Sequence, residues 1–416
     1  MKVGILGAGI SGLSVGKLLN SHLDVEVLEA LPGIGGIAQT RSCEGSSYHP
    51  IGGHCFNSKH QDVLDFVFKH VLEKKQWNTI ERKAVIKLKD KLLTYPIEFA
   101  VKQIAEFDPD LAIDITADFL NTYQRDDCDD LETWFRTNFG NTLAEIYFLP
   151  YNQKIWNMAP RKMQTDWVRG KLPIPDKHTF FRGLLGNEKD KMPHSSFFYP
   201  KTNDQKTFID SLAQGIRVIL NYRVNEIEFD KSAGEWIINN DKRYGILIST
   251  LPLNNLPSLI KNTPQSIIDE SKKLKYNKIS TMLWKTKETK QTWTYIPDSD
   301  TIFHRYIHIG NFFTPSKNLS ITEAVGERSY EEMALEGKKD SFLIEPLDYN
   351  VSDHAYVVFD DNYSNTKSII KNYMDTIEIN LLGRFGEWEY YNMDECIKRS
   401  IILSENIINK YIFKKA

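Results

Sequence analysis

The amino-acid sequence predicts an α/β fold that combines a parallel sheet, an inserted helical domain and an antiparallel sheet. Three observations support this prediction. A strand, a glycine-rich turn and a helical pattern open the chain, residues 60–170 carry apolar side chains at three- and four-residue spacing, and residues 253–375 alternate between strand-like and polar segments. The length of 416 residues fits two or three domains, or one large domain with insertions.

Composition and charge exclude several classes of protein. Hydrophobic residues make up 41% of the chain, enough for a packed core, so general disorder is excluded. The 52 Lys and Arg nearly balance the 55 Asp and Glu, and such a chain shows no basic footprint for nucleic-acid binding. The four cysteines form no CxxC pair, so we expect neither a disulfide framework nor a metal site. No segment reaches the roughly 20 apolar residues of a membrane span, and we expect a cytoplasmic protein without membrane insertion.

The first thirty residues carry the pattern of a dinucleotide-binding Rossmann unit. Val3–Leu6 is long enough for one buried parallel strand, and residues 24–29 form the next one. Between them, Gly7-Ala8-Gly9-Ile10-Ser11-Gly12 has the G-x-G-x-x-G spacing, in which the three glycines allow a tight turn, the approach of a pyrophosphate and close helix–strand packing. The helix N-terminus offers its N–H groups to the phosphates, and Glu29 is placed to accept hydrogen bonds from a ribose hydroxyl.

A second glycine cluster favours FAD over NAD as the bound dinucleotide. Ala30-Leu31-Pro32-Gly33-Ile34-Gly35-Gly36 follows Glu29 directly, and its glycines let the backbone approach a further stretch of a long cofactor. This pattern is similar to the E-x(5)-G-G of glutathione-reductase-like FAD proteins. No second G-x-G-x-x-G is present for a dedicated NAD(P) domain, and no signature of covalent flavin attachment is present. We therefore expect non-covalent FAD, with Gly35 and Gly36 in its site.

The other elements are predicted in chain order from periodicity and turn residues. We expect helices at 61–72, 98–107, 111–123, 130–139, 207–214 and 400–410, strands at 83–88 and 92–96, a loop-rich stretch at 174–200, and a meander of strands at 217–221, 223–229 and 235–239. The apolar strand at 244–250 suits a return to the first parallel sheet. The nucleotide-binding domain is therefore expected to be discontinuous, comprising 1–75, 196–252 and 380–416, with a helical substrate domain at 98–195 and an antiparallel sheet domain at 76–97 and 253–379.

Six further strings appear in order along the chain. They are Gly52-Gly53-His54; Tyr95-Pro96; Pro150-Tyr151-Asn152-Gln153-Lys154-Ile155-Trp156; Lys162-Met163-Gln164 with Trp167; Trp293-x-Tyr295 with Arg305; and Gly383-Arg384-Phe385-Gly386 through Tyr390 and Asp394. Together they resemble the UDP-galactopyranose mutase family, most closely its eukaryotic-like branch, within the wider amine-oxidase and protoporphyrinogen-oxidase superfamily. The resemblance covers nearly the whole chain.

This resemblance implies an isomerase that uses flavin without net redox change. Members interconvert UDP-galactopyranose and UDP-galactofuranose through an adduct between the sugar and N5 of reduced FAD, while the protein positions the sugar and holds the departing diphosphate. The implied partners are a UDP-sugar substrate and NAD(P)H as a reductant, and a homo-oligomer stays open. The sequence agrees by omission, since it contains neither a G-x-S-x-G nucleophile elbow nor an H-E-x-x-H motif.

The resemblance also implies roles for individual residues. Gly53 and His54 match the loop that lies against the flavin, where a histidine responds to its redox state. Arg305 matches an arginine that grips the diphosphate, since a guanidinium bonds two phosphate oxygens and stays charged. The other implied positions are Tyr356 and Tyr390 at the diphosphate, Tyr295 and Tyr95 at the uridine, Asn152 and Trp156 near sugar and uridine, and Arg384, Asn392, Met393 and Asp394 at the flavin.

Three departures from the family pattern concern the substrate and the flavin. The second diphosphate arginine falls on Lys171, with Arg169 two residues away. Either the point charge of the lysine ammonium replaces the bidentate guanidinium of an arginine, or Arg169 takes over this role. The usual glycine-rich stretch after a Tyr-Pro pair is here Tyr199-Pro200-Lys201-Thr202-Asn203-Asp204-Gln205-Lys206. Phe312 stands where the eukaryotic branch has a diphosphate tyrosine. These changes leave room for a different nucleotide sugar.

Two other functions remain open from the sequence. The first is an FAD-dependent oxidase or desaturase of the wider superfamily, which shares the N-terminal fingerprint but favours an apolar substrate tunnel over charged groups such as Arg305 and Lys171. The second is a non-catalytic flavoprotein that binds a nucleotide sugar or a partner. The retention of His54 together with the diphosphate positions argues against this second alternative.

Overall fold

The computed structural model describes residues 1–168, 172, 174–186 and 195–413. The helices are α1 (Ile10–Leu19), α2 (Gln61–Phe66), α3 (Val101–Ala105), α4 (Pro109–Leu120), α5 (Leu131–Phe139), α6 (Asn141–Leu143), α7 (Leu149–Trp156), α8 (Lys177–Leu184), α9 (Lys206–Ala213), α10 (Leu256–Leu259), α11 (Gln265–Ser271), α12 (Tyr330–Gly337), α13 (Tyr363–Thr376), α14 (Gly383–Gly386) and α15 (Met393–Tyr411). The strands are β1 (Lys2–Leu6), β2 (Asp24–Leu28), β3 (Arg41–Cys43), β4 (Ser46–Tyr48), β5 (Trp77–Glu81), β6 (Ala84–Leu88), β7 (Lys91–Thr94), β8 (Ser196–Pro200), β9 (Arg217–Ile219), β10 (Ile227–Asp230), β11 (Glu235–Ile238), β12 (Lys242–Tyr244), β13 (Ile246–Ser249), β14 (Tyr276–Thr286), β15 (Trp293–Tyr295), β16 (Phe303–Ile307), β17 (Leu319–Val325), β18 (Leu343–Val357) and β19 (Asn380–Leu381).

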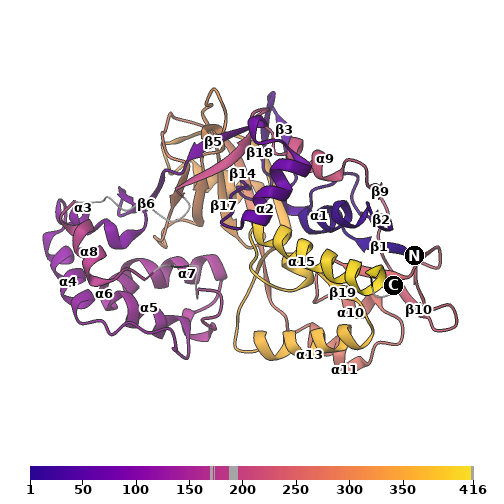
Figure 1. The fold of residues 1–416 in the computed structure, drawn as a ribbon. Coiled ribbons are helices and arrows are strands. Elements are labelled where there is room, and N and C mark those ends of the chain that lie inside the picture. The colour runs from indigo at the N-terminus through magenta and orange to yellow at the C-terminus, as the bar shows by residue number, and fades with distance from the viewer. Residues whose placement is uncertain (169–171, 173, 187–194, 414–416) are drawn as a thin grey trace.

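A parallel sheet forms the Rossmann part of the molecule, at the end where both termini lie (Figure 1). Its strands run in the order β19-β13-β1-β2-β9 within the described residues, so segments from the start, middle and end of the chain lie side by side. β1 pairs in parallel with both β2 and β13. The predicted α/β fold with a discontinuous parallel sheet is confirmed.

Alternation along the strands distributes the apolar side chains to two cores. Val3 and Ile5 on β1 pack on one face, together with apolar residues of α1, α9 and α15. Leu6 and the β13 residue Leu247 pack on the opposite face, with residues of α10, α13 and the β10–β12 hairpins. Since successive strand residues point to opposite faces, a strand buried on both sides needs side chains without charge, as residues 3–6 of β1 are. The parallel sheet is therefore covered by helices on both faces.

A second sheet, mixed but mainly antiparallel, occupies the middle of the molecule. Its order is β18-β14-β17-β16-β15-β6-β7 within the described residues, and only the β15–β6 pair in it is parallel. Strands β6 and β7 bring residues from before the helical region to the edge of this sheet. The sheet therefore joins chain segments from both sides of the helical insertion.

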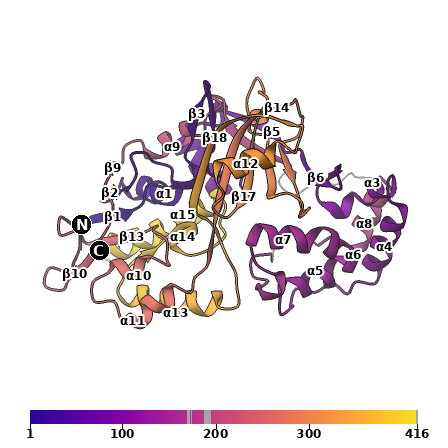
Figure 2. The ribbon, with the colours of Figure 1, turned by 180° about the vertical axis from the view of Figure 1, so that it is seen from behind.

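The helices α3 to α8 form a lobe at the end of the molecule opposite the termini, as both ribbon views show (Figures 1 and 2). Its core is aromatic, with Phe119 stacked on Phe180 and Phe135 stacked on Phe148 at centroid separations of 4.0 and 4.7 Å. The same cluster of buried residues continues into the central sheet through Trp293 and Tyr295. The lobe and the sheet thus share one apolar core.

The structure differs from the sequence prediction at several elements. Residues 217–219 were expected in a meander, but β9 joins the parallel sheet beside β2. The stretch 174–200, expected to be loop-rich, holds α8 and β8, and β8 pairs with β5. The predicted helix at 61–72 changes to wider π-type turns from Val67, and the final helix begins at Met393 instead of residue 400. In the region 253–379, strands occupy 276–357 only, because α10 and α13 cover the parallel sheet instead and α11 packs against them.

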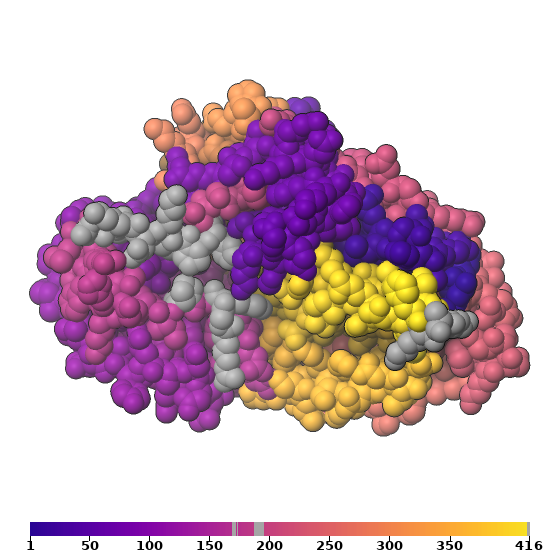
Figure 3. All heavy atoms as spheres, viewed as in Figure 1, coloured from indigo at the N-terminus to yellow at the C-terminus, as the bar shows by residue number. Residues whose placement is uncertain are grey.

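The C-terminal helix α15 lies at the surface beside the segment around α2, where the space-filling view shows yellow atoms against purple ones (Figure 3). In the part of the chain that is described, no helix combines the length and apolar character needed to cross a membrane.

Candidate active site

The glycine-rich loop leaves β1 and enters α1 in a conformation that requires its glycines. Gly7 has a φ of +101°, and a Cβ added to Gly12 would lie 2.0 Å from the carbonyl oxygen of Gly7. The N-cap of α1 is Gly9, which has an extended backbone and no side chain. The N–H groups of the first turn are therefore not capped by a side chain of this residue. Those N–H groups are directed at the space beyond the helix end, which is the arrangement that binds a pyrophosphate.

The second glycine cluster packs directly on the first. Gly35 donates its N–H to the carbonyl oxygen of Ala8 at 2.8 Å, and a Cβ on Gly36 would lie 3.1 Å from the Cα of Gly9. Both Gly35 and Gly36 have positive φ, at +113° and +57°. The two clusters therefore form one backbone surface without side chains, which a long cofactor can approach closely.

Glu29 lies beneath this surface at the end of β2. Its carboxylate accepts hydrogen bonds from the backbone N–H of Ala8 at 2.8 Å and of Leu31 at 2.9 Å, so it ties the two glycine loops together. A carboxylate has about four acceptor positions, so two remain for a ribose hydroxyl. The contact of Glu29 with a ribose hydroxyl was predicted from the sequence. Its hydrogen bonds to the two glycine loops were not.

The C-terminal segment completes the cofactor region. Gly383, with a φ of +85°, lies so close to Ser11 that a Cβ would meet the Ser11 hydroxyl at 2.2 Å. Two buried polar atoms nearby have no hydrogen-bond partner, Nε of Arg384 and Oε1 of Gln205. Orphaned buried polar groups cost stability unless a partner arrives. The glycine surface, the uncapped helix end and these two atoms fit a bound dinucleotide.

Of the other predicted cofactor residues, Met393 and Asp394 lie in the first turn of α15, and exposed Asn392 is its N-cap. The amide nitrogen of Gln205 lies 3.7 Å from the sulfur of Met393. This contact places the altered stretch 199–206 beside the start of α15. Gln205 is thus a candidate cofactor residue that the sequence reading noted only as a departure.

The loop that carries Gly53 and His54 is held by a second histidine. His49 accepts a hydrogen bond from the backbone N–H of His54 on Nδ1 at 2.8 Å, while its Nε2 lies 2.9 Å from the Tyr199 hydroxyl. The Nε2 of His54 lies 2.8 Å from the carbonyl oxygen of Ile51, which requires a proton on that nitrogen. Burial lowers the pKa of His54 to about 4, so the ring is neutral at pH 7 and Nδ1 is its acceptor.

Arg305 lies beside this loop in a buried ionic group. On β16 it faces Glu323 of β17, and its Nε donates to a Glu323 oxygen at 2.5 Å. Burial alone would raise the pKa of Glu323, but the charges of Arg305 and the contact with His304 outweigh burial and hold it at about 2. A Cβ on Gly52 would meet the other Glu323 oxygen at 2.7 Å, so only glycine fits at this point of the histidine loop.

Tyr356 extends the group toward the cofactor region. Its hydroxyl accepts a hydrogen bond from a terminal nitrogen of Arg305 at 3.0 Å. Burial raises the pKa of Tyr356 far above its ordinary value, so the hydroxyl keeps its proton and can donate it to an anionic oxygen. Arg305 and Tyr356 together present donors of the kind that a diphosphate accepts.

Aromatic rings connect Tyr356 to the helical lobe and to the C-terminal segment. The Trp156 ring lies 5.8 Å from both Tyr356 and Tyr390, and the guanidinium of Arg384 lies 4.4 Å from the Tyr390 ring centre. Trp156 donates its indole N–H to Asn152 at 3.1 Å. Predicted residues from α7, β18 and the region before α15 are therefore brought together.

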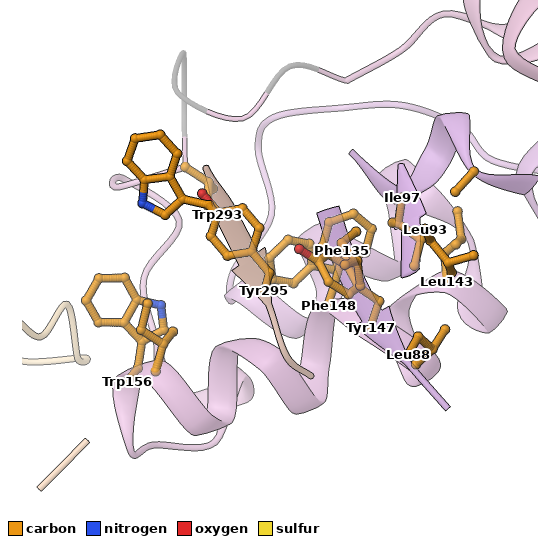
Figure 4. Close-up of a cluster of buried hydrophobic side chains, with 14 of the residues drawn as sticks. Leu88, Leu93, Ile97, Phe135, Leu143, Tyr147, Phe148, Trp156, Trp293 and Tyr295 are labelled. Carbon is orange, nitrogen blue, oxygen red and sulfur yellow. The ribbon is translucent and has the colours of Figure 1, made fainter. Parts of the chain in front are cut away.

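Tyr295 and Tyr95 form a second part of the site, between the central sheet and the helical lobe. Their rings are 4.8 Å apart, and Figure 4 shows Tyr295 directed from its strand toward the buried cluster of the lobe. The Tyr295 hydroxyl accepts a hydrogen bond from Arg82 at 2.7 Å, and the Arg82 guanidinium lies 4.9 Å from the Trp293 ring centre. The sequence reading missed Arg82, because a charged residue in Glu81-Arg82-Lys83 is typical of a solvated surface.

Glu98 is a buried acid three residues after Tyr95, also missed in the sequence. It is 1% exposed, its Oε2 has no hydrogen-bond partner, and burial raises its pKa to about 8. Strongly perturbed acids of this kind cluster at functional sites. At pH 7 the group is a neutral carboxylic acid that can both donate and accept.

This raised pKa makes the stability of the protein depend on pH. In the unfolded chain a glutamate titrates near 4.3, so between about pH 4 and pH 8 the folded protein keeps a proton that the unfolded chain releases, and the free energy of unfolding falls as the pH rises. We expect Glu98→Gln to match the wild type at pH 4 and to exceed its stability by roughly 3 kcal/mol at pH 7 in urea unfolding. Glu106→Gln, at an exposed position, is the control. Parallel pH curves for wild type and Glu98→Gln would show that Glu98 is ionised in the folded state.

The remaining departures are placed as follows. Phe312 is fully buried among Phe197, Tyr199 and Trp293, so its ring fills the core behind the site. Arg169 and Lys171 lie outside the described residues. The described residues contain no group of three or more His, Cys, Asp or Glu side chains arranged to hold a metal ion.

Comparison with known proteins agrees with this geometry. The family description "NAD(P)-binding Rossmann-like domain" matches residues 5–69. The UDP-galactopyranose mutase of Mycoplasma pneumoniae (strain ATCC 29342 / M129 / Subtype 1) is 21% identical over 416 residues, which covers 97% of this chain and 95% of that protein. A dTDP-fucopyranose mutase of Escherichia coli is 24% identical over 198 residues, or 45% of this chain and 51% of that protein.

Solved structures show the same fold. A reduced UDP-galactopyranose mutase superposes with a TM-score of 0.84 at 20% identity, covering 98% of this chain and 94% of the other. A putative protoporphyrinogen oxidase from Exiguobacterium sp. 255-15 superposes with a TM-score of 0.74 at 14% identity, covering 98% of each chain.

The parallel sheet and its paired glycine loops define a dinucleotide-binding protein of the FAD/NAD(P) Rossmann class. Within that class, the chain is similar over 97% of its length to a UDP-galactopyranose mutase, at 21% identity, and it shares the fold of a second such enzyme. The resemblance predicted from the sequence is confirmed at this level.

Proposed function

We propose that the protein is a flavin-dependent mutase that interconverts the pyranose and furanose forms of a UDP-sugar, with UDP-galactose as the first candidate. The observation that carries this proposal is the position of Arg305. It is a largely buried cation, hydrogen-bonded to Tyr356, that lies between the histidine loop and the aromatic group around Trp156. A diphosphate is the chemical group that such a cation and tyrosine hydroxyl suit best.

Each part of the site has a task in this reaction. Arg305 and Tyr356 hold the diphosphate as negative charge grows on it, and Tyr390 is near enough to add a third donor. Tyr95 and Tyr295 offer ring faces to the base, and Arg82 fixes the Tyr295 hydroxyl. Bound FAD, in its reduced state, would supply the nucleophile that the described side chains lack. The glycine surface, Glu29, Arg384 and Gln205 would hold it, and neutral His54 can hydrogen-bond its ring.

The dTDP-fucopyranose mutase among the relatives leaves both the base and the sugar to experiment. Phe312 and the unusual residues 199–206 distinguish this chain from the family pattern. Competition between UDP-galactose, dTDP-galactose and their deoxy relatives would define the natural substrate class.

The flavin state provides the decisive test. We expect the yellow protein to convert UDP-galactopyranose only after anaerobic reduction with dithionite, because only reduced flavin carries a nucleophilic nitrogen. The product is measured by chromatography as a new UDP-hexose peak, with oxidised protein in the same buffer as the control. Equal turnover by oxidised and reduced protein would contradict the mechanism.

The alternative is an FAD-dependent oxidase or dehydrogenase of the amine-oxidase and protoporphyrinogen-oxidase superfamily, whose fold is shared. The Arg305–Glu323–Tyr356 group disfavours it, because a buried ion pair is costly in the apolar tunnel that an amine or porphyrin substrate would favour. Flavin reduction without any UDP binding would move the assignment to the oxidase class.

A further inference from the structure

The sheet is irregular at the residue before Arg305. Phe303 of β16 pairs with Ala324 of β17, and Arg305 pairs with Glu323. These two pairs are two residues apart on β16 but only one residue apart on β17, so His304 is an extra residue without a partner in the ladder. This is the arrangement of a β-bulge, which re-aims side chains and is frequent beside active sites. In a regular strand His304 and Arg305 would point to opposite faces.

Both side chains instead reach the same carboxylate. The Nε2 of His304 lies 3.5 Å from the Glu323 oxygen that accepts the Arg305 Nε–H. Tyr356 is the next ring on this side, with its centroid 6.4 Å from that of His304. The bulge therefore gives Glu323 a second neighbour that can donate a hydrogen bond.

The cost of placing His304 here is high. The side chain is fully buried, and apart from the 3.5 Å contact of Nε2 with Glu323, which is long for a hydrogen bond, neither ring nitrogen has a polar partner. Burial lowers its pKa, so the ring is neutral and carries a single N–H. A phenylalanine would fill the same space without orphaned polar atoms, so the imidazole needs an explanation beyond packing.

We infer that His304 is a positioning residue for the diphosphate, acting through Glu323 on Arg305. Its N–H attracts the Glu323 carboxylate across 3.5 Å and so restrains it, which lets the carboxylate keep its hold on Arg305 Nε while the terminal guanidinium nitrogens face the substrate. Glu323 is fixed from the other side by Gly52 of the histidine loop, against which no larger residue fits. This inference rests on the proposed function, because it assumes that Arg305 binds a diphosphate.

The test compares variants that separate the N–H from the volume of the ring. His304→Phe keeps the volume without the donor, and His304→Gln keeps a neutral donor. We expect His304→Phe to weaken UDP binding, measured by calorimetry, by about tenfold and to raise KM far more than it lowers kcat, whereas His304→Gln restores most of the affinity. In an Arg305→Ala background, His304→Phe should have no further effect. If His304→Phe does not fold, His304→Met takes its place.

The outcomes separate the two levels of the argument. Wild-type affinity in His304→Phe, equal losses in the Phe and Gln variants, or the same loss in the Arg305→Ala background would each overturn the role of His304 while leaving the proposed function intact. A wild-type protein that binds no UDP would overturn the proposed function, and the role of His304 with it.

Discussion

UDP is expected to bind Arg305→Ala 2 to 3 kcal/mol more weakly than the wild type, or roughly 30- to 150-fold. A charge-assisted contact to the diphosphate is lost, and Glu323 is left as a buried carboxylate without its main partner. The tyrosine hydroxyl at position 356 also loses its donor. Turnover should fall further than binding, because the charge on the leaving diphosphate grows in the transition state.

The measurement is calorimetric titration of UDP and UDP-galactose into both proteins. Arg305→Lys is a second variant that keeps the positive charge but loses the planar guanidinium with its paired donors. We expect it to recover only part of the affinity for UDP. Arg243→Ala is the matched control, because Arg243 is half exposed and pairs with Asp230 on a distant hairpin. Unchanged UDP affinity in Arg305→Ala would remove Arg305 from the site.

Gly12→Ala is expected to bind flavin at least tenfold more weakly than the wild type and to purify with less of it. The new Cβ would lie 2.0 Å from the backbone oxygen of Gly7, so either the loop or the helix α1 must move. Overpacking of this kind costs about 1 to 3 kcal/mol, and a loss of about 1.4 kcal/mol is already a tenfold change in affinity. The helix end would no longer meet the pyrophosphate at the right distance.

Flavin content is measured as visible absorbance per mole of purified protein. Gly33→Ala provides a control in the neighbouring loop, since nothing lies within 4 Å of a Cβ at Gly33. Circular dichroism of both variants separates cofactor loss from unfolding. Full flavin occupancy in Gly12→Ala would show that the phosphate approaches the loop elsewhere.

The sequence predicted the parts of the fold that local pattern determines. At residues 3–12, a short apolar strand is followed by glycines in the G-x-G-x-x-G spacing, a combination that few other structures share. This strand–glycine–helix unit forms as predicted. The edge strand at 217–219 was misplaced because three residues cannot reveal whether their partner strand is parallel or antiparallel. The helix at 177–184 was missed because Gly183 and the nearby Gly186 read as turn residues, whereas Gly183 packs against Phe99.

The site was only partly predictable for a related reason. Arg305, Tyr356 and Tyr390 could be named from their resemblance to a family, but their grouping depends on contacts between β16, β18 and the segment before α15. Glu323 and Glu98 were missed although one signal was present, namely an acid inside an apolar stretch, which requires a partner or a raised pKa. His304 could not be found at all, because only the bulge places it on the side of Arg305.

The contact between Gly383 and Ser11 has a consequence for what a bound cofactor reports. The nucleotide loop follows β1, but β19, Gly383 and α15 complete its surroundings from segments far along the chain. When these segments are not packed, Ser11 and one flank of β13 are uncovered. Retention of a cofactor by this loop therefore depends on long-range packing as well as on the local glycine motif, so that flavin content also reports whether distant segments have folded together.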